Sequence, residues 1–331
     1  MRAFLNGPMR ASRNIEGAMH TLWILLSKTF NAWVEDKAQR LGAALAYYGA
    51  FSVTPLLVLV LAFVGFFYKA DTLPLIQDQI ARIAGVNAAD AIVATIRGVK
   101  NTGASGTATI VSIVGLFIGA TGMFGQLQDA MNTIWQVTPK PRRLWADILR
   151  TRLLSFAMVL AICVLLLSSM MLSAFLAAAS AYFKHILPFT GAVWPLVDFA
   201  ISFGLTTLLF AAIFKILPDV YIAWRDVWLG AATTAVLFAV GKIGLGLYLG
   251  RSSFSSAYGA AGSLLVLLAW IYYSAQILFF GAEFTWVYSK HYKHRLVPAR
   301  GAVFLTEEMR VKQGIPRADT VKEALKKRKI A

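Results

Sequence analysis

The sequence predicts an all-α, polytopic membrane protein built as a bundle of six transmembrane helices. Of its 331 residues, 58% are hydrophobic and only 15% are charged, whereas soluble domains contain about 25% charged residues. Several apolar runs exceed the roughly 18 residues that identify a membrane helix. Lys and Arg residues also collect in alternate connecting segments, which is typical of a chain that crosses a membrane repeatedly.

We expect three parts: a cytoplasmic N-terminus (1–40), a membrane domain with six spans (41–290) and a cytoplasmic tail (291–331). Residues 1–40 form a cytoplasmic N-terminus, in which Gly17 to Arg40 has the pattern of an amphipathic helix lying on the membrane surface. A cytosolic helix packed on the bundle is the alternative. Residues 69–106 form a polar periplasmic excursion and residues 291–331 a basic cytoplasmic tail. The expected spans are 41–68, 107–128, 153–183, 193–214, 227–250 and 256–286 of the 41–290 membrane domain.

The distribution of positive charge predicts the orientation. With the N-terminus inside, 25 of the 32 Lys and Arg residues fall in cytoplasmic segments and 6 fall outside. Cytoplasmic loops are enriched in Lys and Arg, so both termini are expected in the cytoplasm. The same rule accounts for the net charge of +16 without a nucleic-acid partner.

Two spans carry polar groups that lipid cannot satisfy. Tyr48, Ser52 and Pro55 lie on one face of the first span, and Pro55 frees a backbone carbonyl that needs a partner. Residues 252–282 contain no charge but several polar aromatic side chains. Tyr272 and Gln276 share a helix face with Glu283, which directly follows this run. We therefore expect these two faces to line a substrate pathway, with a purely structural kink at Pro55 as the alternative.

Ionisable residues within the spans suggest two polar groupings. Asp198 and Lys242 are expected at similar depths, so they form an ion pair or share a cavity, unless Lys242 extends alone to the outer surface. Asp129, Arg225 and Glu283 are expected to cluster at the cytoplasmic side. This cluster is either part of a substrate site or a static lock that holds helix ends together.

The sequence contains no recognisable catalytic arrangement. No phosphate-binding GxxxxGK[ST] motif occurs, and the four histidines lack a neighbouring carboxylate set that would complete a metal site. We therefore expect no metal and no cofactor. Two GxxxG spacings, Gly115–Gly119 and Gly246–Gly250, predict close helix contacts, either within the chain or in a homo-oligomer.

Four motifs, taken in order, resemble those of the YihY/BrkB family of bacterial inner-membrane proteins, and in particular its YhjD-like members. The resemblance covers about residues 20–290 and includes YxxxSVTPLL from Tyr48, GATGMFGQLQDAMNTIW from Gly119, ILPDVYIAWRDVWLGA from Ile216 and SAYGAAGSLLVLLAWIYYSAQILFFGAEFT from Ser256. It implies a transporter-like architecture in the inner membrane. YhjD-like members are associated with movement of lipid or lipopolysaccharide precursors, and BrkB-like members with serum resistance.

We therefore expect a transporter or flippase-like protein that handles a lipid or lipopolysaccharide-type amphipathic substrate. Its expected partners are membrane lipids, including anionic ones. The first alternative is a non-transporting scaffold that docks envelope proteins through residues 69–106. The second is a membrane-bound tRNA-processing ribonuclease, the family's old label. The scattered acidic residues argue against it, because hydrolysis needs metal ligands or an acid–base pair.

Overall fold

The structure of the protein, a computed structural model, is predominantly helical. It describes residues 7–67, 77–78, 81, 90, 106–140, 193–251 and 260–330. The expected third span, 153–183, and most of the expected excursion lie outside the described residues. Six long helices are present in the described part: α1 (Gly7–Glu35), α2 (Ala38–Phe67), α5 (Gly106–Ile134), α7 (Val193–Ile216), α8 (Trp224–Arg251) and α10 (Ala260–His291).

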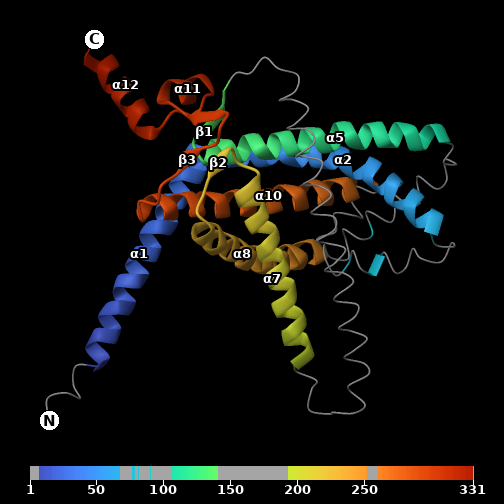
Figure 1. Cartoon of the computed structure of the whole chain (residues 1–331), viewed down its shortest axis with the longest axis horizontal. Helices are drawn as coiled ribbons and strands as arrows, with labels where there is room; N and C mark the ends of the chain where they lie inside the picture. The colour runs from blue at the N-terminus through green and yellow to red at the C-terminus, as the bar shows by residue number, and fades with distance from the viewer. Residues whose placement is uncertain are drawn as a thin grey trace.

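Four of these helices form the body of the bundle. In Figure 1, α2, α5, α8 and α10 extend along the long axis, while α1 and α7 diverge obliquely. Helix α2 packs on α5 and α10, α10 also packs on α8, and α8 packs on α7. Past its middle, α2 bends away from α5 in Figure 1. Pro55 lies in this half of α2, and its side chain is outside the described residues.

Three of the described helices are long and apolar enough to cross a membrane. They contain the segments Phe199–Ile216, Trp224–Gly244 and Leu264–His291. Exposed apolar side chains such as Phe199, Val240 and Leu264 cover their outer surfaces, as expected where lipid replaces water as the solvent. The protein is therefore a helical membrane protein, whereas six spans with both termini in the cytoplasm stay predictions.

Two short antiparallel ribbons gather at one end of the bundle, which we call the strand end. β1 (Val137–Pro139) pairs with β4 (Ala302–Phe304), and β2 (Val220–Tyr221) pairs with β3 (Val297–Pro298). The segment after α10 thus returns to pair with the turns that follow α5 and α7. It continues into α11 (Glu307–Lys312) and α12 (Ala318–Ile330). The sequence predicted a basic tail here, whereas residues 294–312 form a cap on the bundle.

The packing of α8 on α10 depends on two glycines. A Cβ at Gly230 would lie 1.7 Å from Thr285 Oγ1, and one at Gly281 would lie 1.9 Å from Thr234 Oγ1. Each threonine hydroxyl donates a hydrogen bond within its own helix. Thr234 donates to Gly230 O and Thr285 donates to Gly281 O, both at 2.7 Å. The two helices therefore fit together reciprocally, each placing a threonine over the other's glycine.

The contact of α2 with α5 and α10, which we call the seam, is equally close. Ser52 is buried beside Gly119, and its hydroxyl donates to Tyr48 O at 2.8 Å. Gln276 lies against Gly42 and donates from Nε2 to Ala38 O at 3.4 Å. Ser52 and Gln276 therefore lie where helix packs on helix, and that they line a pathway stays a prediction. Gly119, the second glycine of the first GxxxG spacing, lies at this close contact.

A reciprocal amide–carboxylate clamp connects two of the sequence motifs at the strand end. Asn132 Nδ2 donates to Asp219 Oδ2 at 2.9 Å, and the Asp219 N–H donates to Asn132 Oδ1 at 2.8 Å. Gln128 Nε2 lies 3.4 Å from the same carboxylate. The clamp fixes the turn before β2 on the end of α5, so these polar motif residues have a structural role.

Candidate functional site

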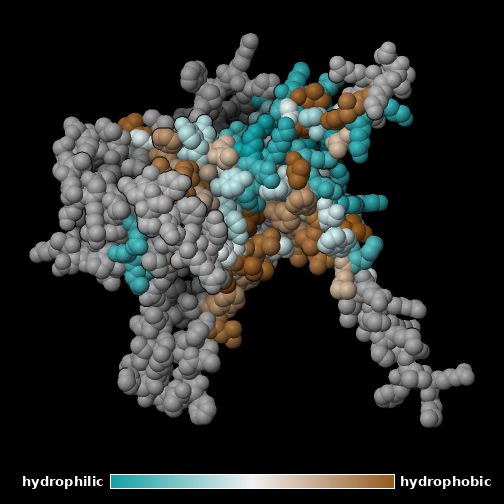
Figure 2. Space-filling view, turned by 180° about the vertical axis from the view of Figure 1, so that it is seen from behind, coloured by the Kyte–Doolittle hydropathy of each residue, from teal (hydrophilic) through white to brown (hydrophobic). Residues whose placement is uncertain are grey.

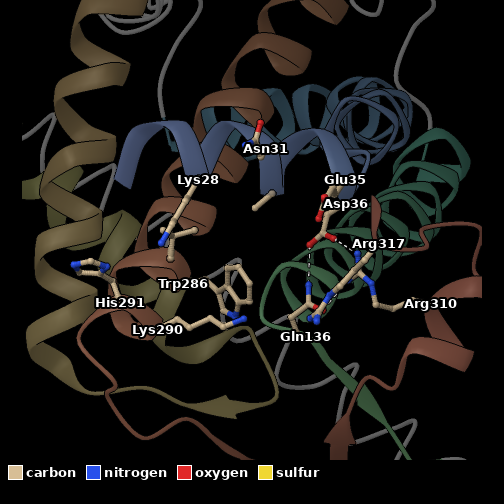
Figure 3. A pocket seen from close by; sticks show the side chains of 12 residues that line it. Lys28, Asn31, Glu35, Asp36, Gln136, Trp286, Lys290, His291, Arg310 and Arg317 are labelled. Atoms are coloured by element: carbon tan, nitrogen blue, oxygen red, sulfur yellow. Dashed lines mark hydrogen bonds and ion pairs between the residues drawn. The ribbon is translucent and has the colours of Figure 1, made fainter. Parts of the chain in front are cut away.

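The described part of the chain contains a polar pocket of about 520 Å³ at the strand end. We call it the basic pocket. Its walls come from the second half of α1 and the turn that follows it, the last turns of α10, the turn after α5, the cap, and Arg317 between the cap and α12 (Figure 3). The lining residues are Lys28, Asn31, Ala32, Glu35, Asp36, Gln136, Trp286, Val287, Lys290, His291, Arg310 and Arg317. These segments are far apart in sequence and meet only in the fold.

Positive charge dominates the wall formed by α1 and α10. Lys28 and Lys290 are both exposed, and neither forms an ion pair with another described residue. The Lys290 ammonium lies 4.7 Å from the centre of the Trp286 ring, a cation–π contact. The positive charges of Arg317 and Lys28 repel it. The pocket thus presents cations that lack an anionic partner, which favours an anionic ligand.

The floor of the pocket is a buried ion pair. Arg310 is 1% exposed and Asp36 is 2% exposed. Arg310 Nη2 lies 2.7 Å from Asp36 Oδ1, and Arg310 Nη1 donates to Gln136 Oε1 at 2.7 Å. Gln136 Nε2 in turn donates to Asp36 Oδ2 at 3.0 Å, so the three side chains form a closed ring (Figure 3). Asp36 occupies the two-residue turn between α1 and α2, which places its carboxyl in the floor.

Burial raises the pKa of the Asp36 carboxyl above its ordinary value of 3.8, and the Arg310 guanidinium opposes that rise. Such a shift is expected when desolvation outweighs a single ion pair. The neighbouring Glu283, on α10, is fully buried, and neither of its carboxyl oxygens has a hydrogen-bond partner. Glu283 does not line the pocket, so a second carboxyl lies below the floor, beside Asp36 and Arg310.

Helix α1 connects the basic pocket with the membrane. One face, including Leu25 and Thr29, is buried against α10, where Leu25 packs with Phe284 and Val287. A second face carries Lys28 and Asn31 toward the pocket. A third face exposes large apolar side chains, namely Met19, Leu22, Trp23, Phe30 and Val34. Such an arrangement suits a helix that packs on the bundle while its free apolar face enters the lipid interface.

The surface view agrees with this division. Figure 2 shows hydrophilic side chains gathered over the strand end, with a field of hydrophobic side chains directly beside them. The basic pocket opens where these two kinds of surface meet, since it lies between α1 and the end of α10.

The structure groups the predicted cytoplasmic cluster differently. Glu283 lies beside Asp36 and Arg310. Asp129 is exposed, and the nearest charge that influences it is the Asp219 carboxylate. Arg225 is exposed in the first turn of α8. The expectation that these side chains meet because they share a depth is thereby corrected: depth along a span does not decide which face a side chain occupies.

The remaining predicted residues take separate positions. Lys242 is exposed on α8, while the side chain of Asp198 lies outside the described residues, so their pairing stays a prediction. Tyr48 and Tyr272 are partly exposed, at 40% and 36%. A different pair forms at the strand end, where His294 Nδ1 lies 2.8 Å from Asp226 Oδ1.

Sequence reasoning missed the residues that make the basic pocket. The sequence pattern places Lys28 only within the amphipathic segment Gly17 to Arg40, and Arg310 and Arg317 only within the basic tail 291–331. One local signal was present: Thr306 precedes a helix that begins Glu307-Glu308, and its side chain accepts a hydrogen bond from Met309 N. An N-cap of this kind predicts a defined helix start, which argues for a folded cap.

Apolar spans, a partly buried amphipathic helix and a charged end together define a polytopic helical membrane protein. A family model described as "Virulence factor BrkB" matches residues 29–303, and the chain belongs to this family. The expected YihY/BrkB membership is confirmed.

Curated relatives carry the name "UPF0761 membrane protein". The one from Tolumonas auensis is 28% identical over 288 residues, which covers 83% of this chain and 90% of that protein. The one from Cronobacter sakazakii is 25% identical over 262 residues, covering 76% of this chain and 85% of that protein. No solved structure matches the chain.

Proposed function

We propose that the protein is a bacterial inner-membrane transporter of the flippase type that takes an anionic, lipid-like amphipathic substrate. The basic pocket carries the proposal. Its free cations, Lys28 and Lys290, face a space of about 520 Å³, within the roughly 300–1,000 Å³ of small-molecule sites. Oxygen-rich anionic headgroups are the ligands that such cations bind in proteins.

The location of the pocket supports a lipid rather than a free anion. The pocket adjoins α1, whose outer face exposes Trp23 and Phe30. A lipid seated with its headgroup between Lys28 and Lys290 could extend its acyl chains along that apolar face. With both termini cytoplasmic, as the charge distribution predicts, the pocket takes up its substrate from the cytoplasmic leaflet. This function needs no metal, cofactor or hydrolytic step.

Transport in reconstituted liposomes tests the proposal. Fluorescent phosphatidylglycerol and phosphatidylcholine analogues are followed across the bilayer for the wild type and for the double variant Lys28→Gln/Lys290→Gln. We expect the wild type to move the anionic analogue faster and the variant to lose that preference. The matched control is Arg295→Gln/Lys312→Gln, which removes two exposed charges outside the pocket. Equal rates for the wild type and the pocket variant would contradict the proposal.

A non-transporting envelope scaffold is the second candidate, and the seam favours it. Ser52 and Gln276, expected to line a pathway, are used in close contacts with Gly119 and Gly42. Such packing suits a rigid support. In the liposome experiment, a scaffold would bind the anionic lipid without moving it, so measuring binding and transport on the same sample separates the two functions.

A further inference from the structure

The two carboxyls below the basic pocket compete for one guanidinium. Asp36 has its full set of strong partners, because Arg310 approaches Oδ1 at 2.7 Å and Gln136 donates to Oδ2 at 3.0 Å. Glu283 has none: it is 0% exposed and both carboxyl oxygens lack a hydrogen-bond partner. The charges of this buried group do not balance while both carboxyls are ionised.

An ionised Glu283 would be an uncompensated buried charge. Leaving one charge of a buried set unpaired is strongly destabilising, and a buried carboxyl normally avoids this by taking up a proton. A protonated Glu283 gains a donor, and Asp36 is the acceptor beside it. One proton then satisfies Glu283 and leaves Asp36 as the counterion of Arg310.

We propose that Asp36 and Glu283 hold a single proton between them, and that this proton-binding site fastens the α1–α2 turn and the cap to α10. Asp36 belongs to the turn, Glu283 to α10 and Arg310 to the cap, so three segments meet at the site. Loss of the proton places two carboxylates side by side. Their repulsion separates the turn from α10 and opens the floor of the basic pocket.

The charged groups around the site are few. Glu35, at the end of α1, adds a second negative charge near Glu283, and Arg310 from α11 supplies the positive one. Glu307 lies 3.8 Å from Arg310 Nε at the outer side of the cap. The turn after α5 contributes the neutral Gln136, and α8 contacts this part of α10 through neutral residues at Gly230 and Thr234. Arg317 is the other cation near the site: its Nη2 donates to Gln136 Oε1 at 3.4 Å, but its side chain is exposed and forms its ion pair with Glu307.

The sign of the pH effect follows from linkage. An unfolded chain releases the glutamate proton near pH 4.3, whereas the folded site keeps it, so the folded state binds more protons above that pH. Stability then falls as the pH rises. The fastening is present while the site holds its proton and is lost as the site deprotonates. This behaviour does not depend on whether the basic pocket binds lipid.

Glu283→Gln is the informative variant, because the amide imitates a protonated carboxyl and cannot ionise. Infrared spectroscopy of the purified full chain should show a protonated-carboxyl band in the wild type that Glu283→Gln removes. Hydrogen exchange of the Leu305 amide, which donates to Gln136 O at 2.8 Å, reports attachment of the cap. We expect exchange in Glu283→Gln to match the wild type at neutral pH.

Asp36→Asn provides the contrast, since it removes the counterion of Arg310. The exchange rate of the Leu305 amide should rise by about a hundredfold or more, because loss of a buried ion pair shifts the opening equilibrium of the cap by about that factor. The melting temperature of the wild type should also fall with rising pH more steeply than that of Glu283→Gln. Equal rises in exchange for Glu283→Gln and Asp36→Asn would show that Glu283 is ionised and would overturn the proposal. The proposal would also be overturned if the wild type lacked the protonated-carboxyl band, or if the melting temperatures of the wild type and Glu283→Gln changed equally with pH.

Discussion

The seam and the basic pocket share helix α10, yet they are built in opposite ways. In the seam, polar side chains such as Gln276 lie against glycines, and helix contacts fill the space. At the strand end, the same helix presents Lys290 to an open pocket whose floor is a buried ion pair. The comparison separates a region that holds the bundle together from a region that can accept a ligand.

The largest effect should come from the floor of the pocket. Arg310→Ala removes the counterion of Asp36 and leaves two carboxyls buried without a cation. We expect a loss of about 3–5 kcal/mol in the free energy of unfolding, measured by thermal unfolding in detergent. Lys312→Ala removes an exposed charge from the same short helix and should leave the melting temperature nearly unchanged. If both variants melt alike, the floor does not stabilise the protein.

A smaller loss is expected at the contact of α10 with α8. This contact and the seam together form the closely packed part of the bundle, which we call the filled region. Gly281→Ala places a methyl group 1.9 Å from Thr234 Oγ1, so the helices must separate. Overpacking of this kind costs about 1–3 kcal/mol. Gly204→Ala adds the same methyl group on α7, where nothing lies within 4 Å. Because alanine favours helix, it should leave stability equal or raise it by up to about 1 kcal/mol. In thermal unfolding, the melting temperature should fall for Gly281→Ala and stay equal or rise for Gly204→Ala.

The smallest effect concerns the outer side of the cap. The Arg317 N–H, which donates to Glu307 Oε1 at 2.8 Å, lowers the pKa of Glu307 below its ordinary value of 4.5, and the Thr320 hydroxyl adds to this. A lowered pKa means that the stabilisation is present above the unfolded value and is lost as the pH falls through the folded one. The carboxyl is partly exposed, so solvent screens the effect.

Hydrogen exchange of the Arg317 amide, corrected for the intrinsic rate, measures this contribution. Protection should weaken as the pH falls below about 4.5, and Glu307→Gln should remove most of the change. This direction is opposite to the one expected for the Asp36–Glu283 site, where stability falls as the pH rises. A protection that strengthens on acidification would contradict the assignment.

The sequence anticipated the filled region better than the pocket. Five of the six expected spans coincide with the described helices α2, α5, α7, α8 and α10, with ends that differ by up to six residues, and the third span lies outside the described residues. The polar faces of Ser52 and Gln276 identified sides that meet other helices. Local pattern cannot show whether such a face meets a cavity or a glycine of a neighbour. That choice depends on how closely two backbones approach, which is a property of the packed bundle.

The basic pocket could not be assembled from the sequence because its residues come from four separate segments. Lys28 and Asp36 precede the first expected span, Gln136 follows α5, and Arg310 lies beyond the last span. Counting charge by side predicts the same side for Lys28 and Arg310, and the structure brings both to the strand end. The count treated them as loop charges, however, since nothing local shows that the chain after α10 folds back through β3 and β4.

The most direct test of the account is native mass spectrometry of the purified protein in a mixture of phosphatidylglycerol and phosphatidylcholine. If the basic pocket binds an anionic headgroup, the wild type retains phosphatidylglycerol preferentially. The Lys28→Gln/Lys290→Gln variant loses that preference, and Arg295→Gln/Lys312→Gln keeps it. The same lipid retention in the wild type and the pocket variant would show that these lysines do not hold a headgroup, and the proposed site would be wrong.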